Sequence, residues 1–335
     1  MNMDIGRLPH GSRNLITDVP GVRVGHATVD TEKCHTGVTV VLPPPRNPFA
    51  QKLTAAACVF NGFGKSMGLV QVEELGSLET PIALTNTLNV GKVHDAMVSY
   101  MIGLCETDGI RLTSVNPVVC ECNDSRISEI ARRPVGEQEV FAAIRSASED
   151  FRQGAVGAGR GTVCYGLKGG IGSASRLMEL DGKTYTMGVL VQSNYGASGD
   201  LRGACLPEGL AESDQGSIIL VVATDLPLSS RQLKRVLRRT SVGMARLGSY
   251  IGHGSGEIAV GFTTAPAADS GGSFRTQEIL KEEWMNIPFR AVGECAEEAI
   301  LQSMWNAEPD TALDGTPIPS LRDYWRDYSE KGEAT

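Results

Sequence analysis

Short apolar segments rich in β-branched residues recur along the chain, and they constrain the fold more than any other feature of the sequence. Segments such as GVTVVL and SIILVVAT carry apolar side chains at consecutive positions rather than at alternate ones. Because side chains alternate between the two faces of a strand, such segments predict sheets that are buried on both sides. Six segments fit this description, at residues 37–42, 54–60, 81–86, 185–194, 217–224 and 257–264.

Apolar residues at helical spacing occupy much of the remaining chain. The order of elements is not strictly alternating, because strands 37–42 and 54–60 follow each other without a helix between them. This mixture favours a layered α/β sandwich over a doubly wound Rossmann sheet. No low-complexity linker and no internal repeat divides the chain, so we expect one compact domain over residues 1–335. The expected helices lie at residues 89–106, 136–147, 227–248 and 288–308.

The composition is that of a globular protein, and it argues against several classes of function. The 335 residues are 41% hydrophobic and carry a net charge of −8, whereas proteins that bind nucleic-acid phosphates normally have a basic surface. No apolar run is long enough to cross a bilayer, and the N-terminal segment has no apolar signal core. We therefore expect a cytoplasmic protein with neither nucleic acid nor a membrane as a partner.

The eight cysteines are scattered through apolar surroundings, and no zinc-type spacing is present among them and the five histidines. We expect reduced thiols, no metal and no organic cofactor. The glycine-rich segment 154–176 has Thr162 where G-x-G-x-x-G requires its third glycine, and Lys168 lacks a Walker pattern around it. We interpret these glycines as points where backbone segments approach closely.

The sequence GHGSGEIAVGFTT contains the most distinctive candidate site. It has no G-x-S-x-G motif, and His253 is two residues from Ser255, a spacing at which side chains rarely converge. A serine at a chain N-terminus needs no histidine, because its α-amino group titrates near neutral pH and can act as the base. Cleavage of the Gly254–Ser255 bond by the Ser255 hydroxyl would create such a serine. The alternative interpretation is an ordinary turn between a helix and a strand.

A series of segments in a fixed order resembles the family of L-aminopeptidase D-alanine-esterase/amidases and β-aminopeptidases, which are self-processing serine peptidases. The series starts with NLITDVPGVRVGHAT and ends with FRAVGECAEEAI, so it covers most of the chain. Between them lie ELGSLETPIALTNT, NPVVCECND, VGAGRGTVCYGLKGGIGSASR, GVLVQSNYG and VVATDLPL.

The resemblance implies a four-layer αββα sandwich, similar to N-terminal-nucleophile hydrolases but differently connected. It also implies self-cleavage at Gly254–Ser255 into chains of residues 1–254 and 255–335, which assemble as a tetramer of processed pairs. The resemblance further implies roles for individual residues. Ser255 matches the nucleophile, and Glu121 in CECND is the candidate anion for the free amino group of a substrate.

Asn194 in SNYG is the candidate oxyanion donor, with a turn asparagine as the alternative. A serine and a glutamate near the last helix assist the nucleophile in β-aminopeptidases, and we place them at Cys295 and Glu297. A cysteine donates only a weak hydrogen bond. The alternative for Glu297 and Glu298 is a solvated helix face with at most one of them pointing inward.

The predicted function is hydrolysis that releases N-terminal residues from short peptides, amides or esters. One alternative is acyl transfer, because ornithine acetyltransferases use a related fold with an N-terminal threonine. A second alternative is an unprocessed, non-enzymatic relative that keeps the fold as a binding module.

Overall fold

Two sheets packed face to face form the centre of the molecule. The computed structural model describes residues 5–202, 214–269, 273 and 275–322. The larger sheet has the strand order β4-β3-β12-β11-β10-β9, and the smaller has the order β1-β2-β5-β6. The strands of the larger sheet are β3 (Leu53–Gly62), β4 (Ser77–Leu78), β9 (Ile171–Leu180), β10 (Lys183–Asn194), β11 (Gln215–Thr224) and β12 (Gly254–Thr263). Those of the smaller sheet are β1 (Arg23–Asp30), β2 (His35–Leu42), β5 (Ile82–Asn86) and β6 (Val118–Cys122).

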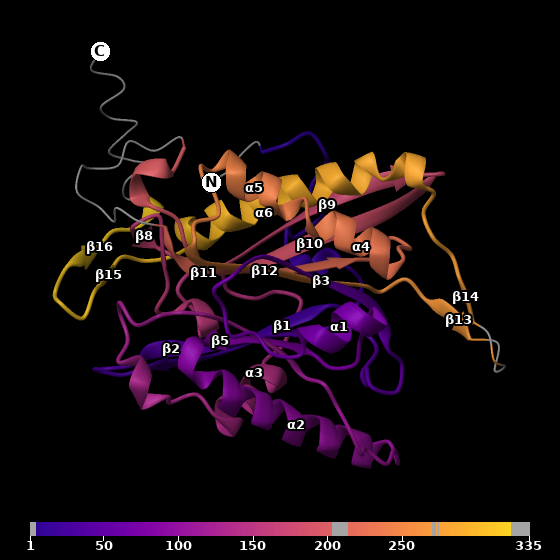
Figure 1. Ribbon diagram of the computed structural model, residues 1–335, viewed down its shortest axis with the longest axis horizontal. Coiled ribbons are helices and arrows are strands. Elements are labelled where there is room, and N and C mark those ends of the chain that lie inside the picture. The colour runs from indigo at the N-terminus through magenta and orange to yellow at the C-terminus, as the bar shows by residue number, and fades with distance from the viewer. Residues whose placement is uncertain (1–4, 203–213, 270–272, 274, 323–335) are drawn as a thin grey trace.

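Helices cover the outer face of each sheet, as Figure 1 shows. Helices α4 (Ser230–Leu237), α5 (Thr240–Arg246) and α6 (Asn286–Trp305) lie over the larger sheet. Helices α2 (Val90–Thr107) and α3 (Glu137–Arg145) lie under the smaller one, and the short α1 (Leu69–Leu75) packs on β3. The predicted four-layer αββα sandwich is therefore confirmed.

Short elements connect these layers. The two-stranded pairs are β7 (Val163–Cys164) with β8 (Leu167–Lys168), β13 (Ala267–Asp269) with β14 (Arg275–Gln277), and β15 (Asp310–Thr311) with β16 (Pro317–Ile318). The 3-10 helices are η1 (Ile16–Asp18), η2 (Thr87–Asn89), η3 (Ile130–Arg132), η4 (Gly157–Gly159), η5 (Ser198–Asp200) and η6 (Glu282–Trp284).

The consecutive apolar residues of the strands fill two cores at once. In β11, Ile219 and Val221 belong to the core between the sheets, whereas Ile218 and Leu220 belong to the core beneath α4 to α6. This arrangement follows from the alternation of side chains along a strand. The prediction of sheets buried on both sides is thus confirmed.

The strand register brings three distant parts of the chain to one end of the larger sheet. Asn194, the last residue of β10, is opposite Ser217 of β11, and Ser217 is opposite Gly256 of β12. Strands β11 and β12 run parallel, and β12 pairs with β3 in the antiparallel sense. The Gly254–Ser255 junction therefore begins a strand that lies between β3 and β11 in the sheet.

Strand β9 was not predicted from the sequence, because small residues rather than an apolar run follow its first residue, Ile171. One of them, Gly172, lets α6 pack closely: a Cβ at this position would overlap the backbone at Ala299 and Ser303.

We expect Gly172→Ala to lower the free energy of unfolding by about 1–3 kcal/mol through overpacking. The control is Gly103→Ala in α2, where a Cβ meets nothing within 4 Å and the higher helix propensity of alanine should stabilise the chain. Denaturant unfolding of both variants measures the difference, and equal stabilities would contradict this account of the packing.

Candidate active site

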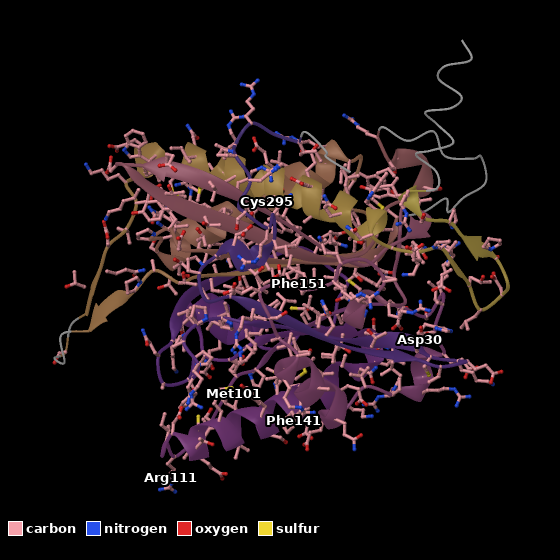
Figure 2. All side chains as sticks on the ribbon, turned by 180° about the vertical axis from the view of Figure 1, so that it is seen from behind. Asp30, Met101, Arg111, Phe141, Phe151 and Cys295 are labelled. Carbon is pink, nitrogen blue, oxygen red and sulfur yellow. The ribbon has the colours of Figure 1, made fainter. Side chains whose placement is uncertain are left out.

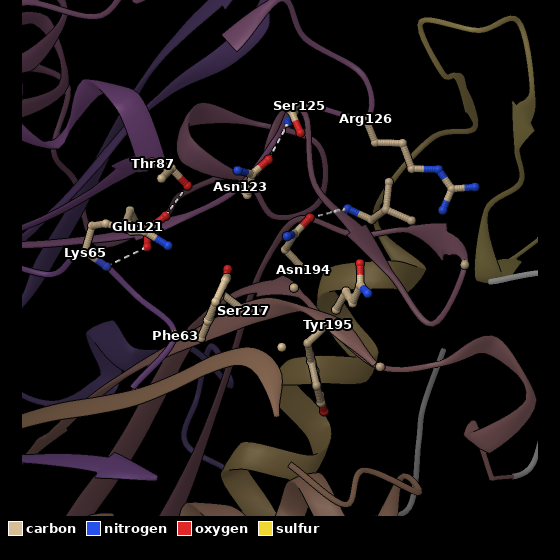
Figure 3. Close-up of a pocket in the computed structure, with 16 residues that line it drawn as sticks. Phe63, Lys65, Thr87, Glu121, Asn123, Ser125, Arg126, Asn194, Tyr195 and Ser217 are labelled. Atoms are coloured by element: carbon tan, nitrogen blue, oxygen red, sulfur yellow. Dashed lines mark hydrogen bonds between the residues drawn. The ribbon is translucent and has the colours of Figure 1, made fainter. Parts of the chain in front are cut away.

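A cavity of about 530 Å³ opens where the ends of the two sheets meet. Three of the residues predicted from the sequence line it: Glu121 from β6, Asn194 from β10 and Gly254 from β12. Figure 3 shows Glu121 and Asn194 on two sides of this space. The other lining residues are Phe63, Lys65, Thr87, Asn123, Ser125, Arg126, Val163, Gly166, Tyr195, Gly196, Gln215, Gly216 and Ser217.

Glu121 presents a fixed carboxylate to this cavity. Its side chain is only 3% exposed. One carboxylate oxygen accepts a hydrogen bond from the backbone nitrogen of Lys65 at 2.9 Å, and the other accepts one from the Thr87 hydroxyl (Figure 3). A carboxylate oxygen can accept more than one hydrogen bond, so both oxygens keep the capacity to bind a cation. The arrangement fits recognition of an ammonium group.

Asn194 is held by one end of its amide group. Its Oδ1 accepts a hydrogen bond from the backbone nitrogen of Val163 at 3.0 Å (Figure 3), which fixes which end of the amide is oxygen. The Nδ2 group is thereby left to donate on the cavity side. Gly196, two residues further along, has a φ of +88° and turns the chain. Asn194 therefore occupies the turn position that its sequence suggests and also carries a donor suited to an oxyanion.

The loop before the Gly254–Ser255 bond is fixed by side chains from β3 and from the segment that leads into β11. Asn61 of β3 donates to the carbonyl oxygens of Gly252, His253 and Ser255. The Asp214 carboxylate accepts from Gly252 N at 2.8 Å and from Gly196 N at 2.9 Å. The backbone nitrogen of Ser255 donates to Gly252 O at 3.1 Å. The bond predicted to break thus lies at the start of β12, directly after this fixed turn, on the rim of the cavity.

Gly256 leaves room for the neighbouring chain. A Cβ here would lie 2.5 Å from the carbonyl oxygen of Phe63, in the segment whose Lys65 nitrogen binds Glu121. The glycine after the serine therefore permits the contact between β12 and the segment that crosses to the smaller sheet.

Ser255 and Glu257 form a buried pair, of which the sequence predicted only Ser255 as a site residue. Both residues are fully buried, and neither Ser255 Oγ nor either Glu257 carboxylate oxygen has a hydrogen-bond partner among the described residues. Burial raises the pKa of Glu257 to about 7, with the nearby Ser255 hydroxyl lowering it and the charge of Asp214 raising it. The available signal was the spacing of two, which places both side chains on one face of a strand.

Cys295 and Glu297 lie far from this serine. The Cys295 thiol donates to the carbonyl oxygen of Met187, and Figure 2 shows Cys295 within the upper helical layer. Met187 is opposite Thr224, which is opposite Thr263, eight residues along β12 from Ser255. At about 3.3 Å per residue, this separation is roughly 26 Å.

Of the three glutamates in α6, the two considered in the sequence analysis, Glu297 and Glu298, are each paired with an arginine. Glu297 is paired with Arg246 at 2.8 Å. Glu298 is the one that points inward, to Arg176 at 2.6 Å. The structure does not bring Glu297 or Cys295 to Ser255: Glu297 pairs with Arg246, and Cys295 lies over the opposite end of the larger sheet.

The glycine-rich segment is structural, as expected. A Cβ at Gly159 would overlap the backbone at Gly170. Lys168 is fully buried, and its ammonium group donates to the carbonyl oxygens of Gly159, Thr162 and Gly169. Lys168 therefore binds the chain itself rather than a phosphate.

Within the described ranges, no group of three or more histidine, cysteine, aspartate or glutamate side chains could hold a metal ion. The seven cysteines in that part of the chain are buried and free, and Cys205 lies outside the described residues. None of the described helices is both long and apolar enough to cross a membrane.

Comparison with known proteins identifies the class of protein that this fold and cavity define. Residues 14–318 match Peptidase family S58, and the chain belongs to this family. It is 34% identical over 341 residues to the β-peptidyl aminopeptidase BapA of Sphingosinicella xenopeptidilytica, covering 92% of this chain and 84% of that protein.

Two solved structures are similar over nearly their whole length. A Burkholderia sp. β-aminopeptidase has a TM-score of 0.87 and 35% identity, with 97% of each chain covered. The L-aminopeptidase D-Ala-esterase/amidase of Ochrobactrum anthropi, described as a prototype of the serine aminopeptidases and a variant of the Ntn hydrolase fold, has a TM-score of 0.85 and 32% identity. That match covers 96% of this chain and 97% of the other. The family resemblance and the prediction of an aminopeptidase or amidase are confirmed.

The buried Glu257 carboxyl gives a prediction for stability. Its pKa is about 7 in the folded chain against 4.5 for an ordinary glutamate, so the folded state holds its proton more tightly than the unfolded state. This contribution to stability is complete below pH 4.5 and is lost as the pH rises through 7. Because glutamine does not ionise, the stability of Glu257→Gln relative to the parent should rise between pH 4.5 and 8, by up to about 3 kcal/mol.

The measurement is denaturant unfolding across this pH range, with both chains carrying Ser255→Ala so that they stay uncut. A difference in the free energy of unfolding that does not change with pH would contradict the assignment.

Proposed function

We propose that this chain is an aminopeptidase whose nucleophile is Ser255, released as an N-terminal residue by self-cleavage of the Gly254–Ser255 bond. The observation that carries the proposal is that Gly254 lines the same cavity as Glu121 and Asn194. The cleavable bond, a carboxylate suited to an ammonium group and an amide donor therefore meet in one space, although they come from three strands.

The reaction of the cleaved chain follows from these groups. The α-amino group of Ser255 accepts the proton of its hydroxyl, and the oxygen attacks the carbonyl carbon of the substrate. The Asn194 amide donates to the oxyanion that develops, as such donors do in acyl transfer. Collapse of this intermediate releases the amine or alcohol with the proton from the α-amino group. Water then hydrolyses the acyl-enzyme ester and frees the N-terminal amino acid.

The substrate class follows from charge and size. The buried Glu121 carboxylate selects a free α- or β-amino group near the bond that is cleaved. A volume of about 530 Å³ is in the range that encloses a small ligand, which suits a short peptide, an amide or an ester. The names of the relatives, one a β-peptidyl aminopeptidase and one an L-aminopeptidase D-Ala-esterase/amidase, support the same substrate class.

Removal of the proposed nucleophile tests both reactions together. We expect Ser255→Ala to stay as one chain of 335 residues, and its amidase activity to fall more than about a thousandfold below that of the parent enzyme. Both effects follow because self-cleavage and turnover use the same hydroxyl. Intact-mass analysis and hydrolysis of an amino-acid p-nitroanilide measure the two effects. The control is Ser249→Ala, which removes a nearby buried hydroxyl and should leave the chain cut. Normal fragments from Ser255→Ala would remove Ser255 from the role.

Acetylation of the substrate tests Glu121. Acetylation removes the charge of the amino group and leaves the buried carboxylate unpaired. A charge-assisted contact is worth about 1.5–3 kcal/mol, so kcat/KM should fall about tenfold to over a hundredfold. Glu121→Gln should reduce the difference in kcat/KM between free and acetylated substrates. Self-cleavage should continue in this variant, because the Gly254 junction presents no free amine.

The matched control is Glu106→Gln, which changes an exposed carboxylate near the end of α2. In this variant kcat/KM should fall on acetylation of the substrate as much as in the parent enzyme. An equal penalty in Glu121→Gln and in the parent enzyme would exclude Glu121 from binding the amine.

A further inference from the structure

The proposed self-cleavage needs a base that the uncut chain does not have at its nucleophile. In the cleaved enzyme, the α-amino group of Ser255 takes the proton of the hydroxyl. Before cleavage, the same nitrogen belongs to the Gly254–Ser255 peptide bond, and it donates a hydrogen bond to Gly252 O. An amide nitrogen has no basic lone pair at neutral pH, so another group must accept the proton in the first reaction.

Glu257 shares a strand face with Ser255. In β12, Ile258 packs in the core between the two sheets, whereas Ala259 packs in the core beneath α4 to α6. Because side chains alternate along a strand, Ser255 and Glu257 point to the same side as Ala259. The partner strand β3 carries the register shift here, since Glu257 is opposite Asn61 and Ile258 is opposite Val59.

Both side chains are buried without a hydrogen-bond partner among the described residues. Burial of an unpaired carboxyl is unfavourable, and unsatisfied buried polar groups are uncommon in folded proteins. The Ser255 hydroxyl is close enough to lower the pKa of Glu257, although the two groups do not form a well-aligned hydrogen bond. Such loose geometry is common for a base and its nucleophile before the reaction begins.

The other polar groups at the junction are already engaged or point away. Both oxygens of Asp214 accept hydrogen bonds from backbone nitrogens, and the Asn61 amide donates to three carbonyl oxygens. The His253 side chain is at the exposed tip of the turn. Of these groups, Glu257 is the one with an uncommitted acceptor beside the hydroxyl.

We propose that Glu257 is the general base that activates Ser255 for self-cleavage of the Gly254–Ser255 bond. This inference rests on the proposed function and extends it to the reaction that generates the enzyme.

The reaction balances with one molecule of water. The Glu257 carboxylate accepts the hydroxyl proton as Ser255 Oγ bonds to the carbonyl carbon of Gly254. The C–N bond then breaks, and the Glu257 carboxylic acid returns the proton to the leaving nitrogen, which becomes the α-amino group of Ser255. Water hydrolyses the resulting ester between Gly254 and Ser255 Oγ, so that Gly254 ends as a carboxylic acid and the hydroxyl is restored.

The test is the rate of self-cleavage of freshly translated full-length chain, followed by gel electrophoresis and intact mass. We expect Glu257→Gln to cleave at least about a hundredfold more slowly than the parent chain, the usual contribution of a general base. Glu257→Asp, which keeps a carboxylate, should cleave faster than Glu257→Gln. The control is Glu79→Gln, a buried carboxylate paired with Lys52 away from the junction, which should cleave at the parental rate.

The pH dependence gives a readout that a structural role would not produce. A base works only when deprotonated, so the parental rate should rise with pH to about 7 and then level off. Asp214, in the segment that leads into β11, is the charged group that acts on Glu257, and Asn61 of β3 faces the junction with a neutral amide. A parental rate that does not change between pH 5.5 and 8 would overturn the proposal, even if Glu257→Gln failed to fold.

Hydroxylamine under mild conditions separates the two halves of the reaction, because it cleaves an ester at this site but not the Gly254–Ser255 peptide bond. We expect it to leave Glu257→Gln uncut at Gly254–Ser255, since the ester does not form without the base. Rapid cleavage of this variant by hydroxylamine would assign Glu257 to ester hydrolysis instead and overturn its role in the first step.

Failure of this inference is distinct from failure of the proposed function. A parent chain that is never cut at Gly254–Ser255, or a Ser255→Ala chain that is cut, contradicts the function itself. A parent chain that cleaves while Glu257→Gln cleaves equally fast contradicts the role of Glu257 alone.

Discussion

The contact between the ends of the two sheets is the constraint on which the site depends. The Cys122 thiol of β6 is 3.4 Å from the carbonyl oxygens of Gln192 in β10 and Ser217 in β11. Cys122 directly follows Glu121, and Gln192 precedes Asn194 by two residues. A shift of one sheet over the other would therefore move the proposed amine-binding carboxylate away from the proposed oxyanion donor. The fully buried residues around this contact resist such a shift because protein interiors are closely packed.

The sequence predicts the parts of this arrangement that depend on local pattern. Consecutive apolar residues in 217–224 require burial of both faces, and β11 occupies nearly the same residues. The turn at Asn194 and the start of a strand near Ser255 were likewise readable from glycine positions and apolar runs. One helix was expected over residues 227–248, but the structure has two, α4 and α5, because apolar spacing alone does not reveal the interruption at Arg238 and Arg239.

The parts of the site that depend on how the helices and sheets are placed relative to one another could not be predicted from the sequence. Helical spacing predicts α6 correctly, but nothing local determines how far along the sheet it lies. That position decides whether Glu297 meets Ser255 or Arg246, and the close approach of α6 to Gly172 helps to fix it. Glu257 was missed for a related reason. Its spacing places it on the face of Ser255, but only the packed structure shows that this face is buried and that its carboxylate has no partner.

One chain must support two chemical states if it cuts itself, and the fold explains how it can do so. Strand β12 lies between β3 and β11, so a segment that begins at Ser255 would remain paired on both sides with strands of the segment before it. Helix α6, from the later segment, packs on β9 and β10 of the earlier one. Separation of the pieces would expose the cores on both faces of the larger sheet, which hydrophobic burial opposes. The proposed break would therefore change only the local chemistry: a peptide nitrogen would become an amine, and the base could pass from a buried side chain to the new N-terminus.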